Sequence, residues 1–186
     1  MRDFGHDVSD QGERFAKRLK LFFRPELEIV SDISVFIART NDINVLADID
    51  LKAYEYPCGV DYFKEVVATN PNDQFALIAS TPKAAVAYVT VHVLDTQAEI
   101  FRFGVLPKYR RIGVGTLLMT KLMNRLALTK CTTAITTVPE FVCDPRDLND
   151  VSNFLLFTGF KATMLERDYF YMYGRRYDGV KFWRSL

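Results

Sequence analysis

Histidine and cysteine are scarce in this sequence of 186 residues. The two histidines, His6 and His92, lie too far apart in the chain for a credible histidine metal site. The three cysteines, Cys58, Cys131 and Cys143, show no C-x-x-C spacing, and an odd number cannot pair completely. This usage favours reduced thiols over a disulfide framework. We therefore expect a cytoplasmic protein without a bound metal.

Long apolar runs and an excess of one charge are also missing. No apolar stretch approaches the ~20 residues that a membrane helix requires. Residues 1–10 hold three aspartates and no apolar segment of the kind found in a secretory signal. With 24 basic and 23 acidic residues, the formal net charge is +1, so no global attraction to nucleic acid or to a membrane is expected. Any basic site must be local.

Hydrophobic and aromatic residues are abundant, at 49% and 13%, which predicts a packed globular domain. We place this domain at residues 31–186. Residues 1–30 form an expected N-terminal helical extension, because Phe15, Leu19 and Phe22 recur at helical spacing among basic residues. This helix either packs on the side of the domain or docks an acidic partner or the second subunit of a homodimer.

Periodicity predicts alternating strands and helices in the domain. Helices are expected over 43–53, 60–68, 114–127 and 151–157, and strands over 34–38, 75–79, 86–94, 99–106 and 132–138, followed by a hairpin of 164–173 and 180–183 across 174–179. A helix crosses over between the strands 99–106 and 132–138. These two strands should therefore lie parallel.

The stretch 98–127 organises the chain as an apolar strand, a short basic loop and an amphipathic helix. The start of a helix leaves N–H groups unpaired and carries partial positive charge, so this loop can hold a phosphate. Arg110 and Arg111 add charge, while Gly113 and Gly115 let an anion approach the backbone. The lysine of a Walker loop and the third glycine of a dinucleotide loop are absent. A plain tight turn is the alternative.

The hexapeptide RRIGVG at 110–115 resembles the Q/R-x-x-G-x-G/A pyrophosphate loop of the GNAT family of acetyl-CoA-dependent N-acetyltransferases. Its context strengthens the resemblance, because a strand ends at 105–107 and a later helix runs into Gly-Phe at 159–160, as in that family. The likeness covers 33–183. It implies an α/β (α+β) protein with the GNAT acyl-CoA N-acyltransferase fold, a mixed, mostly antiparallel central sheet flanked by helices.

The same resemblance implies acetyl-CoA as co-substrate, with its pantetheine arm in a gap where the central strand bulges and parts from its parallel neighbour. The residues assigned to the cofactor are Phe103, Gly104, Val105, Arg110, Arg111, Ile112, Gly113, Val114, Gly115, Thr116, Asn149, Asn153 and Phe157. Backbone groups of the first three would pair with the arm and polarise the thioester. A glycine at position 104 suits a close approach or a plain strand bend.

Acetyl transfer to an amine needs a base, because a lysine-like ammonium with a pKa of ~10.4 is mostly protonated at neutral pH. Glu99 is the first candidate, since AEI at 98–100 resembles the segment that carries the general-base glutamate of GNAT histone acetyltransferases. Glu99 is equally an exposed carboxylate at the start of a strand. Glu140 is the second candidate and corresponds loosely to the carboxylate region of ribosomal-protein N-terminal acetyltransferases, where Thr137 takes the aligned place.

Leu155 is the main departure from the family pattern. Many GNAT enzymes have a tyrosine there, which protonates the departing thiolate, and leucine cannot donate a proton. Tyr169 is the candidate catalytic acid, with Tyr171, Tyr173 or water as alternatives. Otherwise the thiolate leaves unprotonated, or catalysis has been lost.

The acceptor is expected to be a primary amine, either a protein N-terminus or a lysine. The tyrosine-rich segment 167–180 resembles the final hairpin of N-terminal amine acetyltransferases, and residues 54–56 are candidate substrate contacts. A small-molecule amine is the alternative acceptor. A non-catalytic CoA-binding scaffold is the alternative from another functional class, and an ordinary sheet surface also accounts for the tyrosines.

Calorimetric titration tests the cofactor assignment. We expect micromolar binding of acetyl-CoA and of CoA to the native protein. Binding should be lost in Gly113→Glu, which puts a negative side chain where phosphate would lie, and weakened or lost in Arg110→Ala. Absence of binding to the native protein would leave the glycines as a simple turn.

Overall fold

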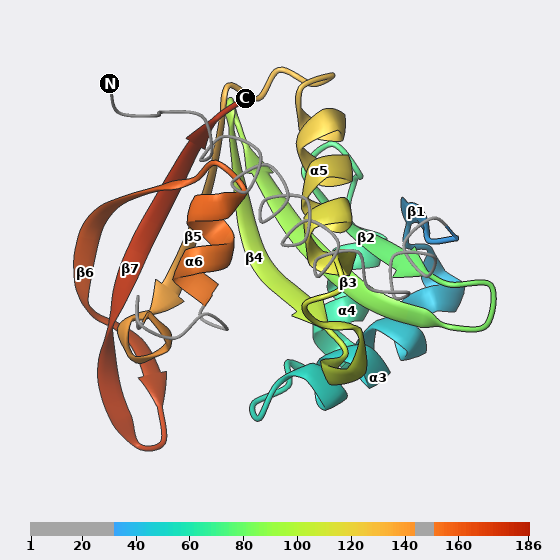
Figure 1. The fold of residues 1–186 in the computed structure, drawn as a ribbon, viewed down its shortest axis with the longest axis horizontal. Helices are drawn as coiled ribbons and strands as arrows, with labels where there is room; N and C mark the ends of the chain where they lie inside the picture. The colour runs from blue at the N-terminus through green and yellow to red at the C-terminus, as the bar shows by residue number, and fades with distance from the viewer. Residues whose placement is uncertain (1–31, 144–150) are drawn as a thin grey trace, which may run out of the picture.

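A computed structural model describes residues 32–143 and 151–186. It is built on a seven-stranded sheet of order β1-β2-β3-β4-β5-β7-β6 (Figure 1). The strands are β1 (Ser34–Ile37), β2 (Gln74–Ser80), β3 (Ala85–Leu94), β4 (Gln97–Val105), β5 (Thr133–Pro139), β6 (Lys161–Met172) and β7 (Arg175–Ser185). All neighbours are antiparallel except β4 and β5, which are parallel as predicted. The predicted extension over 1–30 lies outside the described residues.

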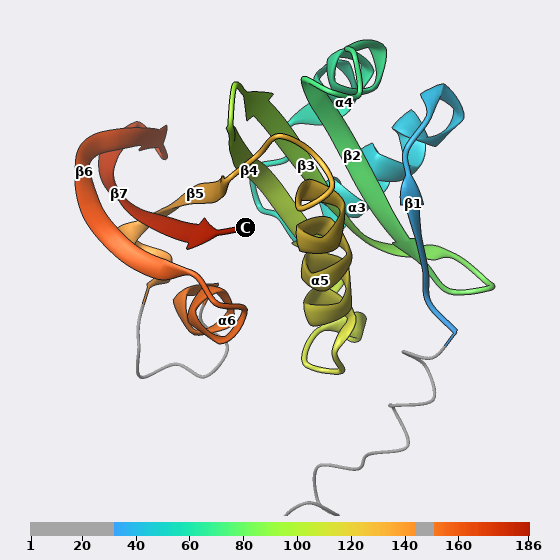
Figure 2. The ribbon, with the colours of Figure 1, turned by 90° about the horizontal axis from the view of Figure 1, so that it is seen from above.

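Helices cover both faces of the sheet (Figure 2). On one face lie α3 (Ile43–Ala53) and α4 (Gly59–Ala68), and on the other lie α5 (Val114–Leu126) and α6 (Val151–Phe157). Three short 3-10 turns complete the described elements: η1 (Thr40–Asp42), η2 (Pro107–Tyr109) and η3 (Glu140–Val142). The expected fold class, a mixed and mostly antiparallel sheet flanked by helices, is confirmed.

Each helical layer buries an apolar stripe against the sheet. On α5, Leu118, Leu122 and Leu126 recur every four residues and pack in one cluster with the inner face of β2, β3 and β4. On the other face, Leu46 of α3 and Phe63 of α4 join a second buried cluster. The sheet therefore lies between two hydrophobic cores, which pack against both faces of its central strands.

β4 and β5 form a fork. The two strands pair only at Gln97–Glu99 against Thr133–Ile135, and beyond this point they diverge (Figure 1). Opposite β3, the register shifts so that Thr90 faces Arg102 while Val91 faces Ile100, which leaves Phe101 as the extra residue of a β-bulge. The bulge and the parting that the family resemblance implies are both present. Beyond the paired segment, one backbone edge of β4 is left open.

The last two strands form a tighter hairpin than the sequence predicted. The expected connection spanned 174–179, but Met172 already pairs with Arg175. Only Tyr173 and Gly174 form the turn, with φ values of 54° and 70°. Two successive positive φ values are typical of the type I′ turn, whose twist matches that of a hairpin. The tight turn extends both strands, so that β6 runs to Met172 and β7 begins at Arg175.

Gly104 is required by packing within the sheet. A Cβ at this position would lie 2.5 Å from Cε1 of Tyr88, whose side chain is fully buried on β3. The ring of Tyr88 therefore lies across the backbone of β4 where a side chain would otherwise project. Packing of Tyr88 therefore accounts for the glycine at position 104, a reason that neither interpretation of the sequence gave.

We expect Gly104→Ala to lower the free energy of unfolding by about 1–3 kcal/mol, because a new methyl group must displace a packed aromatic ring. Gly115→Ala is the matched control. Its Cβ would meet the nearest atom, in the ring of Phe154, at 3.5 Å, an ordinary contact. Urea unfolding of both variants measures the difference, and equal stability of the two would contradict this account.

Candidate active site

The basic loop ends at the start of α5. Gly113 is the N-cap of this helix with a φ of 95°, and Arg111 has a φ of 64°. The first bond of the helix runs from Leu117 N–H to the Gly113 carbonyl (2.9 Å), so the N–H groups of residues 114–116 precede the intrahelical ladder. A thirteen-residue helix therefore directs its positive end into the loop, which suits a phosphate.

Arg110 anchors this loop to the rest of the fold. Its Nε donates to the Val105 carbonyl (2.9 Å), and its Nη2 donates to the Ala53 carbonyl (3.0 Å) at the end of α3. The sequence assigned this arginine to phosphate, but the structure commits two of its donors to the backbone. Both Arg110 and Arg111 are exposed. The positive charge predicted for the loop therefore comes from two exposed guanidinium groups, of which that of Arg110 is anchored.

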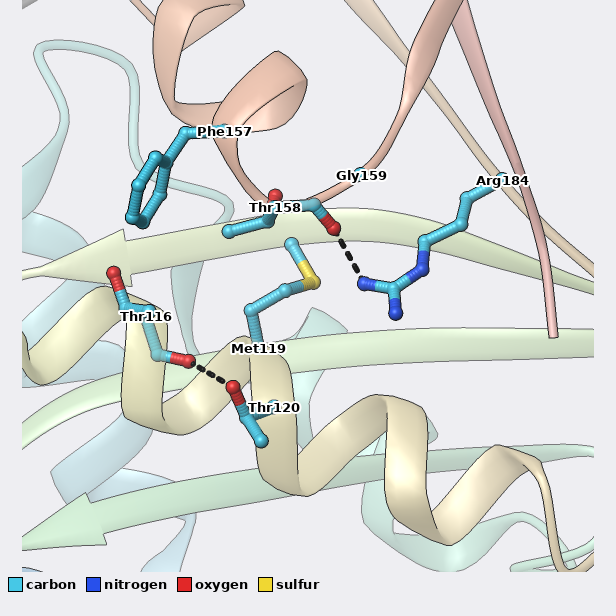
Figure 3. Close-up of a pocket in the computed structure, with 7 residues that line it drawn as sticks. All are labelled: Thr116, Met119, Thr120, Phe157, Thr158, Gly159 and Arg184. Atoms are coloured by element: carbon cyan, nitrogen blue, oxygen red, sulfur yellow. Dashed lines mark hydrogen bonds between the residues drawn. The ribbon is translucent and has the colours of Figure 1, made fainter.

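A hollow of about 330 Å³ lies between α5 and the end of α6. It is lined by Thr116, Met119, Thr120, Phe157, Thr158, Gly159 and Arg184 (Figure 3). The guanidinium of Arg184 donates from Nη1 to the Thr158 carbonyl and points into this space. The Phe157 ring, 77% exposed, stands at its rim. The structure thus brings together Thr116 and Phe157, both predicted from the sequence, and adds Arg184, which was not.

The open edge of β4 faces the fork. Leu106 N–H donates to the Val86 carbonyl of β3 (2.9 Å), and backbone groups alternate sides along a strand. The groups of Gly104 therefore face β3, whereas those of Phe103 and Val105 face the fork. For Gly104 this corrects the prediction of a backbone contact with the cofactor. For Phe103 and Val105 the contact stays a prediction.

The Tyr54 hydroxyl occupies this open edge. It donates to the Phe103 carbonyl (2.9 Å) and accepts from the Phe103 N–H (3.3 Å). Tyr54 follows α3 directly, and the Arg102 guanidinium lies 3.9 Å from the centre of its ring. Burial raises the pKa of Tyr54 above its ordinary value, with the positive charge of Arg102 opposing the shift. The phenol is therefore neutral at physiological pH.

A buried ion pair holds these groups in place. Asp50 of α3 has no exposed surface, and its Oδ1 accepts from Arg102 Nη2 (2.7 Å) and from the Tyr88 hydroxyl. Its Oδ2 accepts from the Cys58 N–H (2.6 Å), and Arg102 also donates to the Tyr56 carbonyl (2.9 Å). Burial works to lower the pKa of Arg102, but hydrogen bonds to Asp50 and Tyr88 raise it overall. The pair ties the loop between α3 and α4 to β4.

Glu99 points to the face that carries α3 and α4. Its neighbours Ala98 and Ile100 are buried in the cluster under α5, and side chains alternate along a strand. Close to it lies Lys181 of β7, whose Nζ donates to Glu166 Oε1 (2.8 Å). This bond raises the pKa of Lys181, and the nearby Tyr169 and Glu99 add to the effect. Glu99 and Tyr169, two predicted catalytic residues, are therefore both near enough to Lys181 to influence its charge.

The remaining predicted residues lie apart from this group. Glu140 is exposed in η3, beyond the end of β5. Asn153 is on α6, and Asn149 lies outside the described residues. Leu155 is buried in the core under the sheet, so no donor replaces the family tyrosine at that position. Its neighbour Phe154 contacts the Phe103 ring, with ring centres 5.3 Å apart.

The hairpin of β6 and β7 reaches across to the loop after α3. The Tyr173 hydroxyl donates to Glu55 Oε2 (2.8 Å), and its ring meets Tyr56 edge to face at 4.5 Å. The hydrogen bond to Glu55 raises the pKa of Tyr173 to about 12. Tyr177 of the same hairpin contacts Phe141 of η3, with ring centres 5.0 Å apart. Exposed aromatic side chains therefore bridge the face on which Glu99 lies.

Sequence reasoning missed Asp50, Arg102, Lys181 and Arg184. An isolated charge inside an amphipathic helix or strand was the available signal, because Asp50 and Arg102 each stand at a position that turns inward. Asp50 and Arg102 are 52 residues apart in the chain, so their pairing was not visible in the sequence. The described part of the chain holds no cluster of His, Cys, Asp or Glu that could bind a metal. In that same part, every helix is too short or too polar to traverse a bilayer.

A fork between two parallel strands, beside a glycine-capped helix start, defines an acyl-CoA N-acyltransferase fold. The model of the acetyltransferase (GNAT) family matches residues 43–142, more than half of the 186-residue chain. The chain therefore belongs to the GNAT family and is an N-acetyltransferase by class. No curated protein matches its sequence.

Solved structures share this fold at low sequence identity. The ribosomal-protein-S18-alanine N-acetyltransferase of Escherichia coli matches with a TM-score of 0.68 and 18% identity, over 83% of this chain and 94% of that one. NAA60 of Arabidopsis thaliana in complex with acetyl-CoA gives 0.71 and 15%, over 83% and 98%. The spermidine/spermine N-acetyltransferase SpeG of Vibrio cholerae gives 0.66 and 13%, over 83% and 93%.

The buried ion pair predicts an unequal response to charge removal. Arg102→Met leaves the carboxylate of Asp50 buried and unpaired, and should lower the free energy of unfolding by about 3–5 kcal/mol. Lys52→Met is the control, because its pair with Asp48 (2.5 Å) has side chains 56% and 54% exposed and should contribute only about 0–1 kcal/mol. Similar losses in both variants, measured by urea unfolding, would contradict the assignment.

Proposed function

We propose that this protein transfers an acetyl group from acetyl-CoA directly to the primary amine of a protein, at an N-terminus or a lysine. The observation that carries the proposal is the fork between β4 and β5. A phosphate-binding helix start opens on one face of the sheet at this fork, and Glu99 lies on the opposite face. Donor and acceptor can therefore approach the same gap from two sides, which is what direct transfer requires.

The proposed cofactor site lies on the face that carries the start of α5. The pyrophosphate of the cofactor would bind the N–H groups at the start of α5, and its pantetheine arm would lie in the fork along β4. The nucleotide end would then reach the hollow beside α5, where the Arg184 guanidinium and the hydroxyls of Thr116 and Thr120 can bind a phosphate. The Phe157 ring at the rim offers an apolar surface to a base.

The proposed acceptor site lies on the opposite face, which carries Glu99. Glu99 is the proposed general base that takes a proton from the ammonium group and frees the nitrogen lone pair. Tyr56, Tyr173 and Tyr177 offer flat apolar surfaces and hydroxyl groups around the approach, which suits a peptide chain. The Lys181 ammonium is paired with Glu166 (2.8 Å), so the nearby Glu99 carboxylate leaves this group of charges net negative and suited to an ammonium group. The tyrosine-lined approach favours a protein amine over a small-molecule amine.

A non-catalytic CoA-binding module is the second candidate function. It is favoured by one observation, the buried leucine at position 155, where the family commonly has a tyrosine. Such a module would bind acetyl-CoA and acetylate no amine. A cytoplasmic location and a homodimer stay predictions, because neither depends on the geometry of the fork.

An acceptor screen that compares the native protein with Glu99→Gln separates the two candidate functions. In an acceptor screen with peptides and small amines, we expect this variant to lower kcat by about 100- to 10,000-fold, because a general base is lost. Its affinity for acetyl-CoA should stay unchanged, since Glu99 lies on the other face. Glu65→Gln, at an exposed position of α4 with no proposed role, is the matched control and should retain activity. Binding without turnover of any amine by the native protein would favour the module instead.

A further inference from the structure

Tyr54 places a hydroxyl where the fork needs a hydrogen-bond donor. Its oxygen lies 3.3 Å from the Phe103 nitrogen and 2.9 Å from the Phe103 oxygen, on the open edge of β4. In a complete sheet, these two backbone groups would pair with a neighbouring strand. Because β5 has diverged at this point, Tyr54 satisfies both groups. A ligand that pairs with this edge must therefore take the place of the Tyr54 hydroxyl or share it.

The hydroxyl is held at this position by the surrounding network. Tyr54 ends α3, whose last turns carry Asp50, and the Arg102 guanidinium paired with Asp50 stacks on the Tyr54 ring at 3.9 Å. The neutral phenol is a donor across physiological pH, because burial raises its pKa. The ring cannot withdraw far while the ion pair is intact, so the hydroxyl must stay close to the Phe103 N–H.

The tyrosines considered from the sequence as the catalytic acid do not occupy this edge. Tyr169 and Tyr171 of β6 are 48% and 72% exposed, and the Tyr173 hydroxyl is bonded to Glu55. Leu155 is buried in the core and has no donor. Among the described tyrosines, Tyr54 is the one whose hydroxyl contacts the open backbone of β4. The sequence indicates Tyr54, within 54–56, only as a candidate substrate contact.

We propose that the Tyr54 hydroxyl and the Phe103 N–H together form the oxyanion hole for acetyl transfer. This inference rests on the proposed function. When the thioester enters the fork, its carbonyl oxygen would accept the Phe103 N–H in place of the Tyr54 oxygen. The Tyr54 O–H, released from the Phe103 carbonyl, would then turn to the same oxygen. Two donors would converge on the atom that gains negative charge.

The step balances without a proton donor for sulfur. Glu99 first takes a proton from the ammonium group and releases it to solvent. The amine nitrogen then forms a bond to the carbonyl carbon, the π pair moves to the oxygen held by Tyr54 and Phe103, and Glu99 takes the second proton from the nitrogen. The pair then returns, the C–S bond breaks, and its electrons leave on sulfur as a thiolate. An alkyl thiol has a pKa of ~8.5 in the case of cysteine, so its anion is stable enough to depart and be protonated by solvent. Leu155 is compatible with this route.

The vibration of the bound carbonyl tests the proposal without an acceptor. Acetyl-CoA with an isotope-labelled carbonyl is bound to the native protein and to Tyr54→Phe, and its stretching frequency is read by difference infrared spectroscopy. We expect a lower frequency in the native protein, because a hydrogen bond from the phenol weakens the C=O bond. Tyr62→Phe is the control. It removes another tyrosine hydroxyl, bonded to Thr90 (2.8 Å) on the same face, and should match the native frequency.

Each outcome decides one of the two proposals. Equal frequencies in the native protein and in Tyr54→Phe, with acetyl-CoA bound to both, would overturn the role of Tyr54 alone. No binding to the native protein would overturn the proposed function, and the oxyanion hole with it. If Tyr54→Phe does not fold, a fluorinated tyrosine at position 54, a stronger donor, should lower the frequency further. With an acceptor in hand, Tyr54→Phe should lower kcat by about 100- to 1,000-fold.

Discussion

The structure depends on the buried pair between Asp50 and Arg102. One carboxylate without exposed surface accepts hydrogen bonds from the guanidinium of β4, the hydroxyl of Tyr88 on β3 and the N–H of Cys58 at the start of α4. Removing a charge from water is costly, and these partners together compensate for it. The same contacts fix the loop after α3 against β4. The Asp50 carboxylate thus both stabilises the fold and helps to position Tyr54.

At the fork, the network around Asp50 borders the candidate active site. A bulge at Phe101 and the short pairing between β4 and β5 leave backbone groups of the central strand unpaired in the middle of the molecule. Such groups are ordinarily satisfied by a neighbouring strand, because leaving them buried and unpaired is unfavourable. Here Tyr54 meets those of Phe103, and Arg110 meets the Val105 carbonyl. The protein therefore fills the edge with side chains that a ligand can replace.

In this protein the proposed catalytic donor does not come from α6. At position 155 a leucine contributes to the core, and the hydroxyl closest to the open edge of β4 belongs instead to the end of α3. The two elements lie on opposite faces of the sheet (Figure 2). A donor from the α3 side would approach the carbonyl oxygen, whereas the sulfur leaves on the other side. In this proposal, a donor at Tyr54 in place of one at position 155 stabilises the oxyanion instead of the departing thiolate.

The order of elements, the parallel pair and the basic loop could be predicted from the sequence, because hydrophobic periodicity and glycine placement are local signals. The sequence also placed Glu99 on β4 as a candidate base. Three features depend on packing and could not be predicted: Arg110 anchors the loop, Gly104 accommodates Tyr88, and the hairpin turns at Tyr173. Arg102 lies 52 residues from Asp50, and Phe103 lies 49 residues from Tyr54. Contacts of that separation arise only when strands and helices pack, so no local pattern encodes them.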